Sequence, residues 1–329
     1  MINNSSEHHS KIEIIPFSSS QIPQAAELFS AQYEKLRKEI PALPDVMLDP
    51  NRVKPDLERI LSRGTGLAAI EGGKLVGYLA WLHIDEFRDT TRTAGYVPEW
   101  AHGCAIGKED QVYPPLYLKA AASWAEKQYP IWCMTCLVNN RFLETYLYRN
   151  GFGMITHDAI RPIHISTRPL DQGVKIRKCS RQDIDILTGL EAEHRNHYSC
   201  APVLMTPREK DTPESIGEFM AENDNSYWLA EIDGIPQGLM RFESVSHGAA
   251  IIVRSPKTIA ITAAFIKPAS RGRGAAYAIL QQALSDYEQM GYTTCSVDYE
   301  TMNPTAYNFW TKYFQPVCFS VMRNPEKFL

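Results

Sequence analysis

The residues best suited to chemistry in this chain form one short segment, Arg271 to Ala276, which reads Arg-Gly-Arg-Gly-Ala-Ala. It follows an apolar run at 259–266 and opens a helical pattern at 277–290. A strand, a glycine-rich turn and a helix in this order aim free backbone N–H groups at the positive end of a helix dipole. Arginines are unfavourable there unless an anion is bound. The segment therefore predicts a site for a phosphorylated cofactor, built from Arg271, Gly272, Arg273, Gly274, Ala275 and Ala276.

The two glycines and two arginines of this segment suit a pyrophosphate. Gly272 and Gly274 let backbone amides approach closely, and Arg271 and Arg273 can add charge-assisted hydrogen bonds. The spacing is not a dinucleotide-binding fingerprint, because the third glycine and a following ribose-binding acid are absent. It is not a P-loop either, because no Gly-Lys-Ser/Thr occurs there. The alternative is a tight turn of small residues without a ligand.

Two carboxylates stand two residues apart on an expected strand. Asp298 lies within the expected strand, residues 295–299, and Glu300 lies two residues later, directly after that range. Side chains at this spacing point to the same side of a strand, so the pair could share a proton or bind a cationic amine. The alternative for both is a structural cap or salt bridge near the end of the strand.

The composition limits the classes of protein to which the chain can belong. Its 329 residues are enough for two domains, and 44% hydrophobic with 22% charged residues is typical of soluble globular proteins. No apolar run reaches the roughly 18 residues that a membrane span needs, and residues 1–10 predict a polar, disordered tail without a signal-peptide core. A net charge of −4 argues against nucleic-acid binding. Seven scattered cysteines favour the reducing cytoplasm.

The chain contains the same pattern twice. Ile22, Gly77 and Asn140 recur as Ile184, Gly238 and Asn303, at offsets of 161 to 163 residues. This predicts a tandem duplication with halves at 11–161 and 174–329, joined by a polar linker at 162–173. Each half is expected to form a strand, two helices, an antiparallel hairpin, and then strand, helix, strand, helix and strand. The predicted fold class is α+β, with two similar domains that each pack helices against a mixed, largely antiparallel sheet.

The second half resembles the GNAT N-acetyltransferase superfamily, whose members transfer acetyl from acetyl-CoA to an amine. Residues 271–276 fit the family's cofactor motif, Gln/Arg-x-x-Gly-x-Gly/Ala, and residues 264–268 fit its apolar approach to a proline. The later pattern Asn-x-x-Ala with an aromatic residue is met by Asn303, Ala306 and Trp310. The match spans about residues 174–323. It implies acetyl-CoA as cosubstrate, without a metal.

The resemblance also implies roles for individual residues. Asp298 would be the general base, and Asn303 would contact the CoA arm, although it could instead only start a turn before its proline. Trp310 departs from the tyrosine that many members use to protonate the thiolate. Tyr313, one helical turn later, could replace it or be a core residue, and a thiolate can also leave without an acid. The strand residues that would border the cofactor are Ala264, Phe265 and Ile266, with the oxyanion held near Ile266.

The first half has the same skeleton without the same chemistry. Its counterpart of the cofactor turn, residues 96–105, carries Glu99 and Trp100 where small residues and bare amides are needed. Leu147 stands seven residues after Asn140, where the family often has tyrosine. This half is therefore predicted to be a degenerate GNAT-like domain that shapes the substrate cleft or stabilises the active half.

The first long helix of the second half supplies substrate-binding candidates. Glu193 and His197 lie four residues apart on one helical face, which suits an amine but also an ordinary solvated surface. The histidines lack a third metal ligand. The Cys133–Cys136 pair lies in an apolar strand pattern and is expected to be buried.

The leading functional hypothesis is a cytoplasmic acetyl-CoA-dependent N-acetyltransferase whose catalytic apparatus lies in residues 174–329. Its partner would be a small-molecule amine such as an amino sugar, a polyamine, an amino acid derivative or an amine antibiotic. Two alternatives stay open: a protein or peptide N-acetyltransferase, and a non-catalytic acyl-CoA-binding module, which Trp310 motivates. The sequence leaves the oligomeric state open, a homodimer included, and predicts neither a nucleic-acid nor a membrane partner.

Overall fold

The computed structural model describes residues 11–166, 169, 173–222 and 224–328. The predicted tail, 1–10, and part of the predicted linker, 167–168 and 170–172, lie outside the described residues. The first half contains β1 (Glu13–Pro16), α1 (Ile22–Glu39), α2 (Pro50–Arg63), β2 (Gly64–Glu71), β3 (Lys74–Ile84), β4 (Ala94–Val97), β5 (His102–Cys104), α3 (Glu109–Glu126), β6 (Ile131–Leu137), α4 (Arg141–Arg149) and β7 (Gly153–Pro162).

The second half repeats this order of elements without a counterpart of β5. It contains β8 (Val174–Lys178), α5 (Ile184–Ser199), α6 (Pro213–Phe219), β9 (Ser226–Ile232), β10 (Ile235–Glu243), β11 (Thr258–Ile266), α7 (Ala275–Gln289), β12 (Thr294–Glu300), α8 (Pro304–Tyr313) and β13 (Gln315–Arg323). The predicted fold class and order of elements are confirmed.

Local sequence signals explain where several elements begin and end. Two-residue turns connect the hairpins β2–β3 and β9–β10, with φ of 56° and 77° at Gly72 and Gly73 and 52° and 77° at Asp233 and Gly234. Positive φ at both central residues matches the twist of the flanking strands. Ser180 caps the short turn that leads into α5, where its hydroxyl accepts from the backbone N–H of Gln182.

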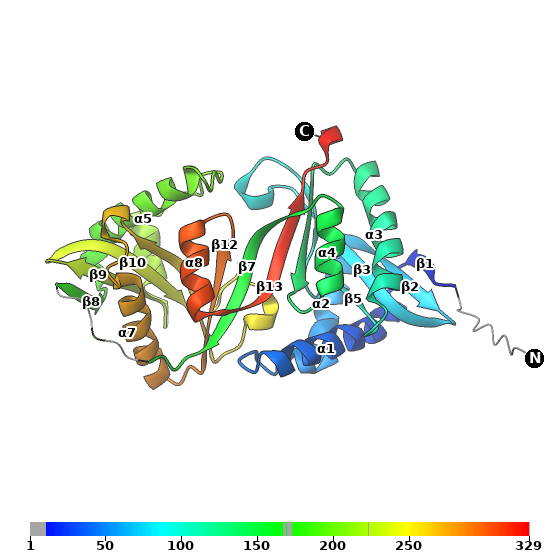
Figure 1. Ribbon diagram of the computed structural model, residues 1–329, viewed down its shortest axis with the longest axis horizontal. Helices are drawn as coiled ribbons and strands as arrows, with labels where there is room; N and C mark the ends of the chain where they lie inside the picture. The colour runs from blue at the N-terminus through cyan, green and yellow to red at the C-terminus, as the bar shows by residue number, and fades with distance from the viewer. Residues whose placement is uncertain (1–10, 167–168, 170–172, 223, 329) are drawn as a thin grey trace, which may run out of the picture.

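One continuous sheet crosses the whole molecule, in the order β1-β2-β3-β4-β6-β13-β7-β12-β11-β10-β9-β8, with β5 on β3. The two central strands are exchanged between the halves: β7, which ends the first half, pairs with β12, and β13, which ends the second, pairs with β6. Figure 1 shows these two strands side by side at the centre, with helices on both faces. The exchange makes each half's sheet depend on the other half.

A loop of the second half also packs in the first half. Ala249 to Val253, from the β10–β11 connection, pack in the hydrophobic core of the first half. Two buried carboxylates hold this loop: Asp158 Oδ1 accepts from the N–H of Ala250 at 2.7 Å, and Glu99 Oε1 from that of Ile251 at 2.6 Å. Burial raises the pKa of both carboxyls, and nearby Asp298 raises that of Asp158 further. Each carboxylate thus fixes the loop at an electrostatic cost.

Among the described residues, no helix combines the length and apolar character that crossing a membrane requires. The Cys133–Cys136 pair is buried in β6 as unlinked thiols, as the strand pattern predicts.

Candidate active site

The candidate site lies where two neighbouring strands separate. β11 and β12 pair in parallel only from Thr258–Thr294 to Ile261–Val297. Beyond this point β11 stays paired with β10 and β12 with β7, and the register of β10 against β11 shifts at Thr262. The strands therefore diverge, and a cavity of about 400 Å³ opens between them.

The glycine-rich turn forms one side of this cavity. Gly272, Gly274, Ala275 and Ala276 line it, and within the described part of the chain their backbone N–H groups have no acceptor. Gly272 and Gly274 have φ of 81° and 74°, in the left-handed region that favours glycine. Among the described residues no side chain caps α7, so its first turn presents bare amides and a positive dipole end. These features fit a pyrophosphate group.

The end of β11 offers a further N–H to the cavity. The N–H of Lys267 donates to the carbonyl of Gln237 on the β10 side at 2.8 Å. Because successive N–H groups of a strand point to opposite edges, that of Ile266 points away from β10, toward the separated β12. Ala264, Phe265 and Ile266 all line the cavity.

Helix α8 contributes Asn303, Trp310 and Tyr313 to the cavity wall. Asn303 caps this helix, with Oδ1 3.3 Å from the N–H of Ala306, and its Nδ2 lies 3.5 Å from Nε2 of His197. Asn303 therefore caps the start of α8 and also lines the cavity. Trp310 is 5% exposed, and the Tyr313 ring packs on Tyr277 of α7 at 4.8 Å.

Asp298 and Glu300 enter the cavity from β12, on the same side of the strand. Asp298 is exposed to the cavity but surrounded by protein, and this burial raises its pKa while Arg208 and other arginines oppose the shift. Glu300 is 5% exposed, and its Oε1 lies 2.8 Å from Nη2 of Arg88. Burial raises the pKa of Glu300, with Arg88 opposing it. The two carboxylates thus have different surroundings.

Two sequence candidates do not line the cavity. Arg273 lies 3.6 Å from Asp233, at the β9–β10 turn, and Glu193 pairs with Lys267 at 2.6 Å. His197, the other substrate candidate, does line it, and burial together with Arg271 lowers its pKa. Of the two residues on this helical face, Glu193 therefore forms an ion pair at the surface and His197 lines the cavity.

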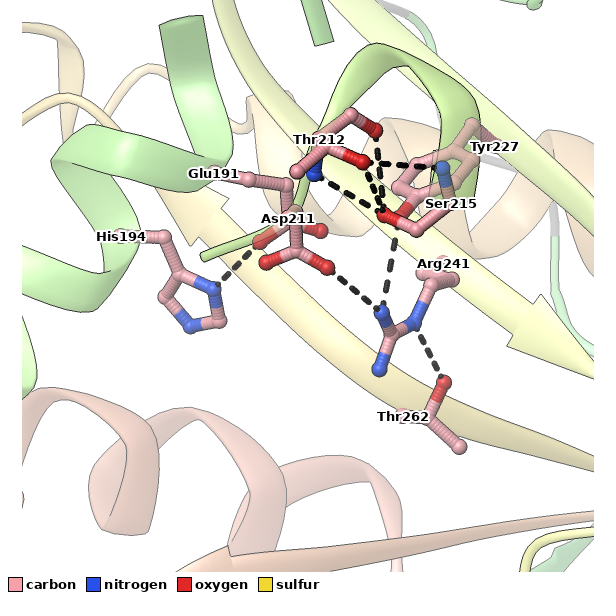
Figure 2. Close-up of polar contacts among 8 residues, drawn as sticks. All are labelled: Glu191, His194, Asp211, Thr212, Ser215, Tyr227, Arg241 and Thr262. Carbon is pink, nitrogen blue, oxygen red and sulfur yellow. Dashed lines mark hydrogen bonds and ion pairs between the residues drawn. The ribbon is translucent and has the colours of Figure 1, made fainter. Parts of the chain in front are cut away.

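A partly buried polar cluster lies beside the cavity and is not among the site residues predicted from the sequence (Figure 2). His194 Nδ1 lies 3.0 Å from the buried carboxylate of Glu191, while Nε2 of His194 has no hydrogen-bond partner among the described residues. Although burial opposes it, the hydrogen bond with His194 lowers the pKa of Glu191. Arg241 donates to Thr262 Oγ1 at 2.9 Å and lies 3.7 Å from Asp211. His194 and Thr262 carry this cluster to the cavity wall.

Three further residues complete the site. Tyr198 and Arg208 line the cavity, with the Arg208 guanidinium 5.8 Å from the centroid of the Tyr198 ring. Burial, Glu300 and Asp298 raise the pKa of Tyr198 to about 12. Arg88 comes from the first half, between β3 and β4. The three-residue spacing of Glu191 and His194 could have revealed that pair, but no sequence pattern indicates Arg88 or Arg208.

The corresponding place in the first half is filled. A cavity of only about 20 Å³ remains there, because His102 of β5 enters the space beside β6. Its Nε2 lies 2.9 Å from the carbonyl oxygen of Thr135, and its Nδ1 lies 3.1 Å from the hydroxyl of Tyr113. Trp100 is 5% exposed and Glu99 holds the β10–β11 loop. These contacts leave little space at this place in the first half.

Comparison with known proteins agrees with this geometry. Residues 191–314 match the model of the acetyltransferase (GNAT) family. The fold is similar to that of a GCN5-related N-acetyltransferase from Sphaerobacter thermophilus, at 13% identity and a TM-score of 0.60 over 95% of each chain. A tandem GNAT protein from the clavulanic acid biosynthesis pathway is similar at 12% identity and a TM-score of 0.50, over 95% of this chain and 97% of that one.

A third similar structure is the GCN5-related glucosamine N-acetyltransferase region of a fungal multi-domain GH3 β-N-acetylglucosaminidase. It shares 13% identity at a TM-score of 0.55, over 95% of this chain and 38% of that chain. At these identities the likeness concerns the fold. Comparison of the sequence with curated proteins gives no match.

Proposed function

Because residues 191–314 match the model of the acetyltransferase (GNAT) family, we propose that the second half of the chain transfers an acetyl group from acetyl-CoA to the primary amine of a small molecule. The family supports acyl transfer in general. The acyl donor and the amine acceptor are inferred from the site. One observation carries this proposal: a single cavity has bare helix-start amides on one side and the carboxylate of Asp298 on another.

The first task of the site is to hold the donor. The N–H groups of Gly272, Gly274, Ala275 and Ala276 would hold its pyrophosphate, with Arg271 adding a charge-assisted contact. Arg271 is already oriented, because its Nε donates to the carbonyl of Ile266 at 3.0 Å. Acetyl-CoA supplies an acetyl group activated as a thioester.

The second task is proton transfer and charge stabilisation. Asp298 accepts a proton from the acceptor's ammonium group, directly or through water, so that a neutral amine can form the new C–N bond as the C–S bond breaks. Its raised pKa brings the carboxylate closer to neutral pH, where a general base works best. The N–H of Ile266 would stabilise negative charge on the carbonyl oxygen. Departure of the thiolate needs no acid, since a thiol's pKa is about 8.5.

The donor site is tested by thermal unfolding with acetyl-CoA. A ligand at 100 times its dissociation constant stabilises the folded state by about 2.7 kcal/mol, so the wild type should show a higher midpoint. Ala276→Glu should lose this shift, because the carboxylate repels phosphate, and should still fold, because an acid suits the first turn of a helix. Ala276→Gln is the matched neutral control. Absence of a shift in the wild type would overturn the proposal.

Turnover is tested by release of free CoA thiol with a panel of small amines. Asp298→Asn should lower kcat by about 10²- to 10⁴-fold with little effect on the midpoint shift by acetyl-CoA. Binding of acetyl-CoA without release from any amine would favour a non-catalytic module. Release only with proteins or peptides would favour a protein acetyltransferase.

The compartment is part of the same proposal. All seven cysteines are free thiols, which suits the reducing cytoplasm.

A further inference from the structure

We propose that the acceptor is an amine that also carries a carboxylate, with Asp298 receiving its ammonium group and Arg208 its carboxylate. This inference rests on the proposed acetyltransferase function and narrows the class of its acceptor. It follows from which charged side chains that line the cavity have an ion-pair partner within the protein and which do not.

The cations on the α7 side of the cavity belong with the donor. Arg271 belongs to the turn that leads into α7, and its Nε donates to the carbonyl of Ile266 at the end of β11. Lys312 is next to Tyr313, whose ring packs on Tyr277 in the first turn of α7. Both cations therefore lie on the side of the bare amides, where phosphates would be bound.

On the other side, one of the two carboxylates is already compensated. Glu300 is buried and paired with Arg88 at 2.8 Å. Asp298 lies two residues earlier on the same side of β12, and within the described residues it forms no ion pair. It is exposed to the cavity, so Asp298 is the carboxylate left to receive a ligand's positive charge.

Arg208 is the complementary group. Its side chain lines the cavity, and no ion-pair or hydrogen-bond partner for it occurs in the described part of the chain. The guanidinium lies 5.8 Å from the centroid of the Tyr198 ring, a cation–π contact that holds it at the wall. A planar guanidinium fixed in this way suits bidentate binding of a carboxylate.

The two charges share one space without neutralising each other. Arg208 is the arginine that most opposes the raised pKa of Asp298, so the groups are close enough to interact. The two side chains form no ion pair with each other, since no nitrogen of the Arg208 guanidinium lies within 4.0 Å of a carboxylate oxygen of Asp298. On the side away from α7, the described residues thus place one carboxylate and one guanidinium without an ion pair. This wall is complementary to a zwitterion rather than to a polyamine or a neutral sugar.

The test uses matched acceptors that differ in the carboxylate alone. Free amino acids and their primary carboxamides are compared by release of CoA thiol at saturating acetyl-CoA. The wild type should prefer the acid. Arg208→Gln should lower kcat/KM for the acid by about 10- to 100-fold, the effect of losing a charge-assisted contact. It should lower kcat/KM for the carboxamide much less, through its effect on Asp298 alone, and leave KM for acetyl-CoA unchanged.

Lys210→Gln is the matched control, since Lys210 is an exposed cation of the same loop outside the cavity lining, and it should change none of these values. Equal losses for acid and carboxamide, or a rise in KM for acetyl-CoA alone, would overturn the inference. So would a wild type that accepts only uncharged amines or polyamines, although the acetyltransferase proposal would then stand. If no amine of any class releases CoA, the proposed function itself fails.

Discussion

Arg88 of the first half and Glu300 of the second form an ion pair, with Nη2 of the guanidinium 2.8 Å from Oε1 of the buried carboxylate. Arg88 reaches this position from a turn in which it and Asp89 adopt φ of 56° and 58°, a conformation that costs non-glycine residues roughly 1–2 kcal/mol each. The first half therefore supplies the counter-charge of a carboxylate that lines the cavity of the second half.

Loss of this pair should destabilise the protein. In Arg88→Gln the carboxylate of Glu300 is left buried without its partner, which should lower the free energy of unfolding by about 3 kcal/mol. The double variant Arg88→Gln, Glu300→Gln removes both charges and should regain most of it. Chemical unfolding of the four proteins in this cycle measures the coupling. Additive losses would show that the pair contributes nothing.

His102 should make stability depend on pH in the acid range. Burial lowers its folded-state pKa from 6.5 to about 4. Between these values the unfolded chain binds a proton that the folded chain does not, so stability is lost as the pH falls from 6.5 toward 4, by about 3 kcal/mol in all. His102→Gln should lose correspondingly less between pH 7 and pH 4.5. Parallel curves for the two proteins would contradict this.

Asp158 should have the opposite pH dependence. Its folded-state pKa is raised, so its contribution to stability is greatest at low pH and declines as the pH rises from 3.8 through the folded value. Asp158→Asn can still accept from Ala250 but carries no charge. It should be more stable than the wild type at pH 8 by about 1–3 kcal/mol and lose this advantage near pH 4.

Asp158→Ala serves as the control for that comparison. It leaves the Ala250 N–H without its acceptor and should be less stable than the asparagine variant at both pH values. Chemical unfolding at pH 4 and pH 8 decides the order. An asparagine variant weaker than the wild type at pH 8 would show that the charge itself holds the loop.

Trp310 should not limit turnover for want of a hydroxyl. Its ring packs on Phe309 at 4.8 Å and Phe314 at 5.4 Å. Trp310→Tyr is expected to lose about 1 kcal/mol of stability without any rise in kcat, because the thiolate leaves unaided. Measurement of kcat against pH checks this. A higher kcat with a new basic limb would show that an acid was missing.

Local order was predictable from the residues themselves. The two-residue hairpin turns, the Ser180 cap and the strand–turn–helix around Arg271 to Ala276 depend on neighbours within a few positions, where φ preferences and capping dominate. The spacing of Asp298 and Glu300 placed them on one side of β12 for the same reason. The repeat at a nearly constant offset likewise predicted a tandem α+β fold.

Tertiary structure alone decided which charges meet. The exchange of β7 and β13, the loop held by Asp158, and the pairing of Arg88 with Glu300 join residues far apart in the sequence. Such contacts depend on shape and on burial of charge over the whole sheet, which no local pattern encodes. The sequence by itself therefore determined the elements and the cofactor turn. The pairing of Glu300 with Arg88, which distinguishes it from Asp298, a carboxylate without an ion pair among the described residues, arose only when the two halves packed together.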